Sequence, residues 1–217
     1  MSLRLSSIIP DGHARKIGIC AVMLMCLTSC TFVPVTPEST IDIGDGGFLT
    51  GEPCGPPCFW GIIPGQTRES EAIEILQERG VFETCEAFDK EAEGGARGMK
   101  CGSQVFIGFG QGDDVVQGVG FNPSSAITVQ GVVAKYGEPE GVLVVPLGVH
   151  VIDAQLVMVY PDMLIWVRLP AQDEAPYILE SSTPVENIAY DMLFGELSYY
   201  EDDPFWKEWQ GYGEYNW

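Results

Sequence analysis

An apolar run near the N-terminus decides how much of this chain is available to fold. The run extends over eleven residues, Ile17–Leu27, and directly follows the basic pair Arg15-Lys16. As a helix it would cover roughly 16 Å, about half of a ~30 Å hydrocarbon core. A charged start followed by a short apolar run is typical of an export signal and not of a membrane-spanning helix. We therefore expect residues 1–29 to be absent from the folded protein.

The apolar run ends in a short motif, Leu27-Thr28-Ser29-Cys30. Small residues leading into a cysteine at this place resemble the lipobox of bacterial lipoprotein signal peptides. The resemblance implies cleavage before Cys30 and attachment of palmitate-type acyl chains, and two or more chains anchor stably where one is marginal. It further implies a lipid-anchored protein of the cell envelope, on the cell membrane or the outer membrane, facing an extracytoplasmic compartment. The alternative is an ordinary secretory signal cut after a small residue.

The chain is strongly acidic, with a formal net charge of −20. Residues 1–29 hold three of its 11 basic residues and one of its 31 acidic residues, so 8 basic and 30 acidic residues remain after cleavage. Such a surface repels phosphate backbones, which argues against nucleic acid as a partner. Basic proteins, cationic peptides and divalent cations are compatible with it. Solubility and spacing from the membrane surface are the simpler interpretation.

The number of cysteines agrees with export. Of seven in total, Cys20 and Cys26 lie in the signal and Cys30 is the lipidation candidate. An even number then remains, which in an exported chain suggests two disulfides with three alternative connectivities. We favour pairing within sequence neighbours, because each pair is then local and the second would brace a hairpin. The predicted pairs are Cys54–Cys58 and Cys85–Cys101.

The mature chain begins with a segment, residues 30–53, that is rich in Pro, Thr, Gly and acids. This composition is typical of a flexible tether between the lipid and the fold. The alternative is that part of it, such as Phe48-Leu49, packs against the fold as an edge segment.

Two helices and seven strands are predicted after the tether. The first helix has Thr67 as its N-cap and stops at Gly80, and the second spans Val129–Tyr136 between Thr128 and Gly137. Alternating apolar runs bounded by turn residues predict the strands. They are Val81–Glu86, Lys100–Phe109, Val115–Phe121, Gly141–Val145, Val149–Tyr160, Met163–Leu169 and Val185–Leu193.

This order of elements predicts an α+β fold, an antiparallel sheet with two short helices. Each helix precedes three strands, so we expect a tandem αβββ repeat whose two units share one core. The first unit takes residues 54–122 and the second residues 123–198. Residues 199–217 remain as an aromatic and acidic C-terminal segment.

The units resemble the small envelope lipoproteins of the SmpA/BamE type. Those proteins follow a lipobox with a polar tether, then a G-x-T…V…G-x-P helix segment and a three-stranded antiparallel sheet. Gly65-Gln66-Thr67 matches the first part, and Thr128, Val132-Val133 and Gly137-Glu138-Pro139 match the second. That family is smaller and lacks the four additional cysteines. The resemblance implies the architecture, and with it a role in envelope assembly.

The C-terminal segment holds three of the five tryptophans. A segment this aromatic is not expected to be disordered. Its side chains either pack on an open sheet face or form an exposed platform that stacks on sugars or anchors a partner protein. The residues of this candidate platform are Trp206, Trp209 and Tyr212.

No catalytic residue, cofactor or resident metal is predicted, and we expect the protein not to be an enzyme. The chain has no G-x-S-x-G motif, and after cleavage His150 is its one histidine. We expect a binding or scaffolding role toward an envelope protein or a glycan. A metal-handling or redox lipoprotein that uses Cys54, Cys58 and His150 is the main alternative, because soft thiolates favour Cu(I). A carbohydrate-active enzyme with carboxylates that the sequence does not single out is a third hypothesis.

Overall fold

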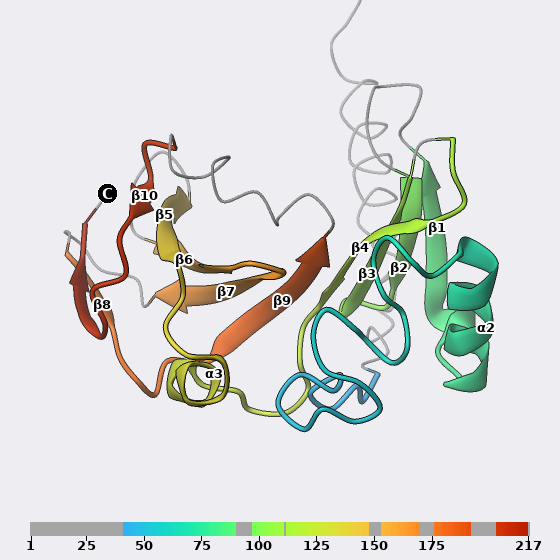
Figure 1. Cartoon of the computed structure of the whole chain (residues 1–217), viewed down its shortest axis with the longest axis horizontal. Coiled ribbons are helices and arrows are strands. Elements are labelled where there is room, and N and C mark those ends of the chain that lie inside the picture. The colour runs from blue at the N-terminus through green and yellow to red at the C-terminus, as the bar shows by residue number, and fades with distance from the viewer. Residues whose placement is uncertain are drawn as a thin grey trace, which may run out of the picture. The chain divides into compact units, whose positions relative to one another are not determined.

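One antiparallel sheet organises the part of the chain that the computed structural model describes, which is residues 41–89, 97–110, 112–147, 153–169, 176–191 and 203–216. Its nine strands are β1 (Cys85–Asp89), β2 (Arg97–Cys101), β3 (Val105–Phe109), β4 (Val116–Phe121), β5 (Gly141–Leu147), β6 (Asp153–Tyr160), β7 (Met163–Leu169), β9 (Val185–Asp191) and β10 (Trp206–Lys207). They lie in the order β1-β2-β3-β4-β9-β7-β6-β5-β10 (Figure 1). A separate antiparallel pair is formed by β8 (Tyr177–Leu179) and β11 (Gly213–Tyr215).

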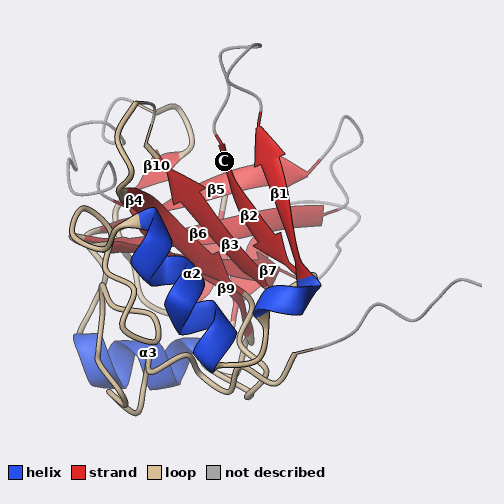
Figure 2. Ribbon diagram, turned by 90° about the vertical axis from the view of Figure 1, so that its right-hand side faces the viewer, coloured by secondary structure: helices blue, strands red, loops and turns tan. Residues whose placement is uncertain are grey.

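The predicted α+β class is confirmed in its coarse form, with strands outweighing the helices. Among the described residues there are two α-helices, α2 (Glu69–Glu78) and α3 (Val129–Tyr136), and a short 3-10 helix, η2 (Phe82–Thr84). Figure 2 shows α2 lying against one face of the strands β1–β4. No helix in the described ranges is long and apolar enough to cross a membrane.

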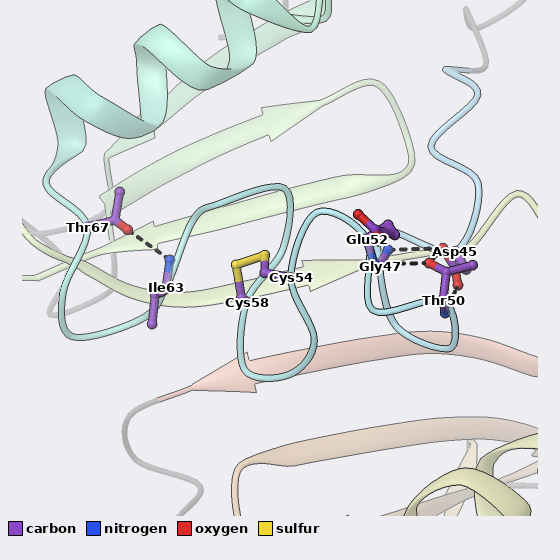
Figure 3. The surroundings of a disulfide bond; sticks show 8 residues. All are labelled: Asp45, Gly47, Thr50, Glu52, Cys54, Cys58, Ile63 and Thr67. Carbon is purple, nitrogen blue, oxygen red and sulfur yellow. Dashed lines mark hydrogen bonds between the residues drawn. A yellow bond between two sulfur atoms is a disulfide. The ribbon is translucent and has the colours of Figure 1, made fainter.

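Helix α2 begins one residue later than the sequence predicted. Arg68 occupies the N-cap position, and the Glu71 carboxylate accepts a hydrogen bond from its N–H at 2.9 Å. Thr67 is not the cap, because its hydroxyl turns back and accepts a bond from the Ile63 N–H at 2.8 Å (Figure 3). Ala72 and Leu76 form the buried face of α2.

Helix α3 is confirmed with its predicted bounds. The Thr128 hydroxyl accepts a bond from the Gly131 N–H at 3.3 Å, which satisfies one of the free N–H groups at the helix start. The helix ends at Gly137, whose φ of 84° lies in the left-handed region that favours glycine. Val129 and Val132 face the core.

The first half of the sheet differs from the predicted strands in two places. The single predicted strand Lys100–Phe109 is a hairpin, because Gly102 has a φ of 54° and turns the chain between β2 and β3. The predicted strand Val81–Glu86 begins only at Cys85, after η2. The first helix is therefore followed by four strands and not three. Of the later strands, β7 has its predicted bounds and the Tyr160–Met163 turn joins it to β6.

Residues 41–53, expected to be flexible tether, are part of the fold. Phe48 is fully buried, and Ile43 is 4% exposed. The Tyr136 hydroxyl donates a hydrogen bond to the carbonyl of Phe48, which ties this segment to α3. Phe48 therefore packs against the fold, as the alternative expected, but residues 44–50 form turns and not an edge strand. The signal 1–29, Cys30, residues 31–40 and His150 lie outside the described residues.

The main core lies between the helices and the sheet and runs through both halves of the chain. Phe121 on β4 connects the halves, because its ring lies 4.6 Å from that of Phe59 and 5.8 Å from that of Tyr190 on β9. A second apolar cluster lies on the opposite face of the second half. It consists of Leu143, Val157, Val159 and Leu164, with Val145, Trp166 and Trp206 packed against them.

Candidate binding site

The four cysteines are joined in the two pairs that the sequence favoured. Cys54 bonds Cys58 across a separation of four residues (Figure 3), and Cys85 bonds Cys101 across sixteen. A sulfur atom in a disulfide is not the thiolate that binds a soft metal. Within the described ranges, no group of three or more His, Cys, Asp or Glu side chains is placed to hold a metal ion. The third member of the suggested metal set, His150, is not among the described residues.

The loop before the first disulfide is held by one carboxylate, that of Asp45 (Figure 3). It accepts hydrogen bonds from the N–H groups of Gly47 (3.0 Å), Leu49 (2.9 Å) and Thr50 (2.8 Å) and from the Thr50 hydroxyl (3.1 Å). Burial by itself would raise the pKa of Asp45, but the bonds from Thr50, Gly47 and Leu49 outweigh it and lower the pKa. This carboxylate is therefore a structural element of the loop.

A cleft of about 350 Å³ opens between α2, η2 and the strands β1 and β2. Its wall is mainly apolar, with one basic and one acidic side chain among the described residues. Such a mixture is typical of sites that hold an apolar group and orient it through a few polar contacts. The lining residues are Glu69, Ile73, Phe82, Ala87, Phe88, Arg97, Gly98, Met99 and Phe109.

Arg97 forms the polar part of this cleft. Its guanidinium lies 2.8 Å from the Glu69 carboxylate on α2 and 5.3 Å from the centre of the Phe109 ring. Its Nε donates to the carbonyl of Gly110 at 3.4 Å. The ion pair joins the first turn of α2 to the first residue of β2, so it fixes the helix on the sheet at the cleft wall. Its charges are mutually compensated, which leaves the cleft suited to an apolar group.

The C-terminal aromatic segment divides between packed and exposed side chains. Trp206 on β10 packs against the second apolar cluster, and a side chain at Gly141 would meet its ring at 2.2 Å. Trp209 packs against the main core, 6.4 Å from the ring of Tyr215. Of the three predicted platform residues, Tyr212 is the exposed one, with 44% of its surface accessible.

Two features of the surface were missed by the sequence analysis. Phe106 on β3 is 41% exposed and lies 5.7 Å from the Lys100 amine. The exposure of Phe106 could have been predicted from the sequence, because successive side chains of a strand point to opposite faces. Val105, Ile107 and Phe109 are buried on one face, so Phe106 points to the other. The Glu69–Arg97 pair is different. It joins residues 28 positions apart, and no local pattern in the sequence indicates it.

Comparison with known proteins gives no relative for this chain, since no family model, curated protein or solved structure matches it.

Proposed function

We propose that this chain is a lipid-anchored, non-enzymatic binding protein of the bacterial cell envelope. The observation that carries the location is the use of its cysteines. Four of them pair within the fold, as expected in an oxidising compartment, and Cys30 follows the apolar run in the sequence as a separate candidate for lipid. Binding is supported by the cleft beside α2 and by the exposed ring of Tyr212.

The anchor is tested by Cys30→Ala, with Cys26→Ala inside the apolar run as the matched control. The full chain is expressed in a bacterial host, and membranes are separated from the soluble fraction. We expect wild type and Cys26→Ala on the membrane with an acyl mass on Cys30, and Cys30→Ala either released or left unprocessed. Membrane retention of Cys30→Ala, with no acyl mass on the wild-type cysteine, would contradict the anchor.

The binding role is tested at Tyr212, the exposed residue of the proposed platform. Tyr212→Ala is expected to lower the melting temperature by no more than about 4 °C, because 44% of the surface of Tyr212 is exposed and less packing is lost than at a core site. We expect it to lose retention on immobilised envelope glycans, and Tyr212→Phe to keep most of it, because the stacking ring remains. Trp209→Ala should lower the melting temperature more than that. Equal retention of Tyr212→Ala and wild type would argue against a glycan platform.

We also propose that the two halves arose by internal duplication, with each helix followed in its half by four strands of the nine-stranded sheet, β1–β4 in the first and β5, β6, β7 and β9 in the second. In each half the start of the helix and the start of the last strand exchange two backbone hydrogen bonds. In the first half, the Glu69 N–H donates to the carbonyl of Asp114 (2.7 Å), and the Val116 N–H donates to the carbonyl of Thr67 (2.9 Å). In the second half, the Val129 N–H donates to the carbonyl of Thr183 (3.0 Å), and the Val185 N–H donates to the carbonyl of Ile127 (2.9 Å). The last strands, β4 and β9, then pair with each other at the centre of the sheet.

A further inference from the structure

The outer edge of β1 carries no strand among the described residues, although the sheet continues on its other side. Figure 2 shows β1 as the outermost strand of this half. The register follows from the disulfide, because Cys85 and Cys101 are opposite each other with Cα atoms 3.8 Å apart. Such a close pair is a non-hydrogen-bonded pair, and its backbone groups point away from each other. By alternation, the N–H and C=O of Ala87 also point outward from the sheet.

The corresponding edge of the second half shows how such an edge is filled. β5 follows α3, as β1 follows α2, and β5 is covered by the short strand β10. Trp206 lies opposite Leu143 and Lys207 opposite Val142, and the Val144 N–H donates to the carbonyl of Phe205 at 3.1 Å. The segment that fills this edge is therefore extended and combines an aromatic side chain with a basic one.

The side chains around β1 define what could occupy its edge. Ala87 is exposed and lines the cleft together with Ile73 on α2 and Phe82 on η2. A strand added beside Ala87 would place one side chain on the cleft side, and its two neighbours would lie on the same face as Glu86. The cleft favours an apolar side chain at the first position, and the carboxylate of Glu86 favours basic ones beside it.

Charge decides between a second copy of this chain and a different partner. Glu86 lies on β1 and Glu83 on the preceding η2, and both are exposed. Pairing of two β1 strands would bring together two edges that each carry the exposed Glu86, in proteins whose net charges are each −20. Like charges opposite each other destabilise a strand pair, whereas opposite charges stabilise it. The charges at the β1 edge therefore disfavour pairing with a second copy of the chain and favour a basic strand.

We propose that the β1 edge and the adjoining cleft bind an extended segment of a partner protein in which Lys or Arg alternates with apolar residues. The segment adds as a further strand, bonds to the outward N–H and C=O of Ala87, and inserts an apolar side chain between α2 and β1. The proposal names a partner class for the proposed binding function and rests on it. It uses a site separate from Tyr212.

The test uses the purified full chain and a synthetic capped peptide of alternating lysine and leucine. Affinity is measured by calorimetry, and exchange of the Ala87 amide by nuclear magnetic resonance. We expect the bound peptide to slow Ala87 exchange at least about tenfold, as for a newly hydrogen-bonded amide. A peptide N-methylated at alternate backbone nitrogens should bind about tenfold or more weakly, because it loses the strand bonds. A peptide with glutamate in place of lysine should not bind.

Ala87→Pro is the protein variant, and Ala87→Ser is its matched control. Proline removes the outward N–H and leaves the bonds to β2 intact, so we expect a similar melting temperature and about tenfold weaker binding. Ala87→Ser keeps the N–H and should bind like wild type. If Ala87→Pro does not fold, the N-methylated peptide decides alone.

Three results would overturn the proposal. If the N-methylated peptide binds with the same affinity as the unmethylated one, the peptide is held by the acidic surface and not by strand pairing. Equal affinity of a folded Ala87→Pro variant means that the edge is not used. A dimer in light scattering, with Ala87 protected before peptide is added, means that a second copy occupies the edge. Each leaves the Cys30 and Tyr212 experiments unaffected, so the wider binding function is judged separately.

Discussion

At the scale of single residues, Asp45 illustrates how a loop without regular structure is fixed. Its carboxylate accepts four hydrogen bonds from residues two to five positions later. These bonds hold together the turn that carries Phe48 into the core. Composition suggested a flexible tether here, because Asp, Gly and Thr are common in linkers. They also form tight turns when an acceptor and several N–H groups converge, and composition alone does not separate the two.

Asp45→Asn is therefore expected to lower the free energy of unfolding at pH 7 by about 1–3 kcal/mol, because an amide replaces one acceptor oxygen with a donor. The pKa of Asp45 is lower in the folded state, so its stabilisation is complete above the unfolded value near 3.8 and is lost as the pH falls through the folded value. Urea midpoints of wild type and variant should converge well below pH 3.8.

Asp42→Asn is the control for this experiment, since Asp42 is exposed and accepts a bond from the Gly44 N–H at 3.1 Å. We expect its urea midpoint to stay close to wild type at both pH values. A midpoint for Asp45→Asn equal to that of wild type at pH 7 would show that the loop does not depend on the carboxylate.

At the scale of elements, sequence signals succeeded where they were local. The Thr128 cap and Gly137 stop define α3, and an apolar run that follows a proline turn defines β7. The prediction of Thr67 as the N-cap of α2 was wrong, because its hydroxyl accepts a hydrogen bond from the preceding loop instead. The turn between β2 and β3 was not predicted, because Gly102 is the one turn-forming signal that the sequence analysis could have used within Lys100–Phe109. β8, β10 and β11 have only two or three residues each, and their pairing partners lie far away in the chain.

The two disulfides differ in the length of chain they close, and this predicts a ranking. Cys85→Ala with Cys101→Ala opens a loop of sixteen residues and should cost about 3 kcal/mol. Cys54→Ala with Cys58→Ala opens one of four residues and should cost about 2 kcal/mol. Alanine is chosen because Cys101 is fully buried and a serine hydroxyl there would need a partner. Urea unfolding under non-reducing conditions measures both, and the reverse order would contradict the loop-length argument.

At the scale of the whole molecule, the way in which the two halves pair could not be predicted from the sequence. The helix–strand order indicated two units, but nothing in it indicated that β4 pairs with β9. The same pairing places β1 at one outer edge and β5 near the other, so β1 has no further strand beside it in the part of the chain that the structure describes. The cleft beside α2 depends on Glu69 and Arg97, which only the folded sheet brings together. Long-range pairings of this kind leave no periodic signal in the chain.

A continuous core through both halves predicts that they unfold together. Phe121 contacts Phe59 from the first half and Tyr190 from the second, and the sheet is unbroken between them. With fluorotryptophan incorporated, the resonances of Trp60 and Trp166 report the two halves separately, and we expect identical urea midpoints. Phe121→Leu should lower both midpoints together, with a loss of about 1 kcal/mol or more in the free energy of unfolding, because it leaves space in the shared core. Ile178→Ala, at a site 46% exposed, should move neither. Two separate midpoints in wild type would mean that each half is a folding unit of its own, joined at β4 and β9 only after it has formed.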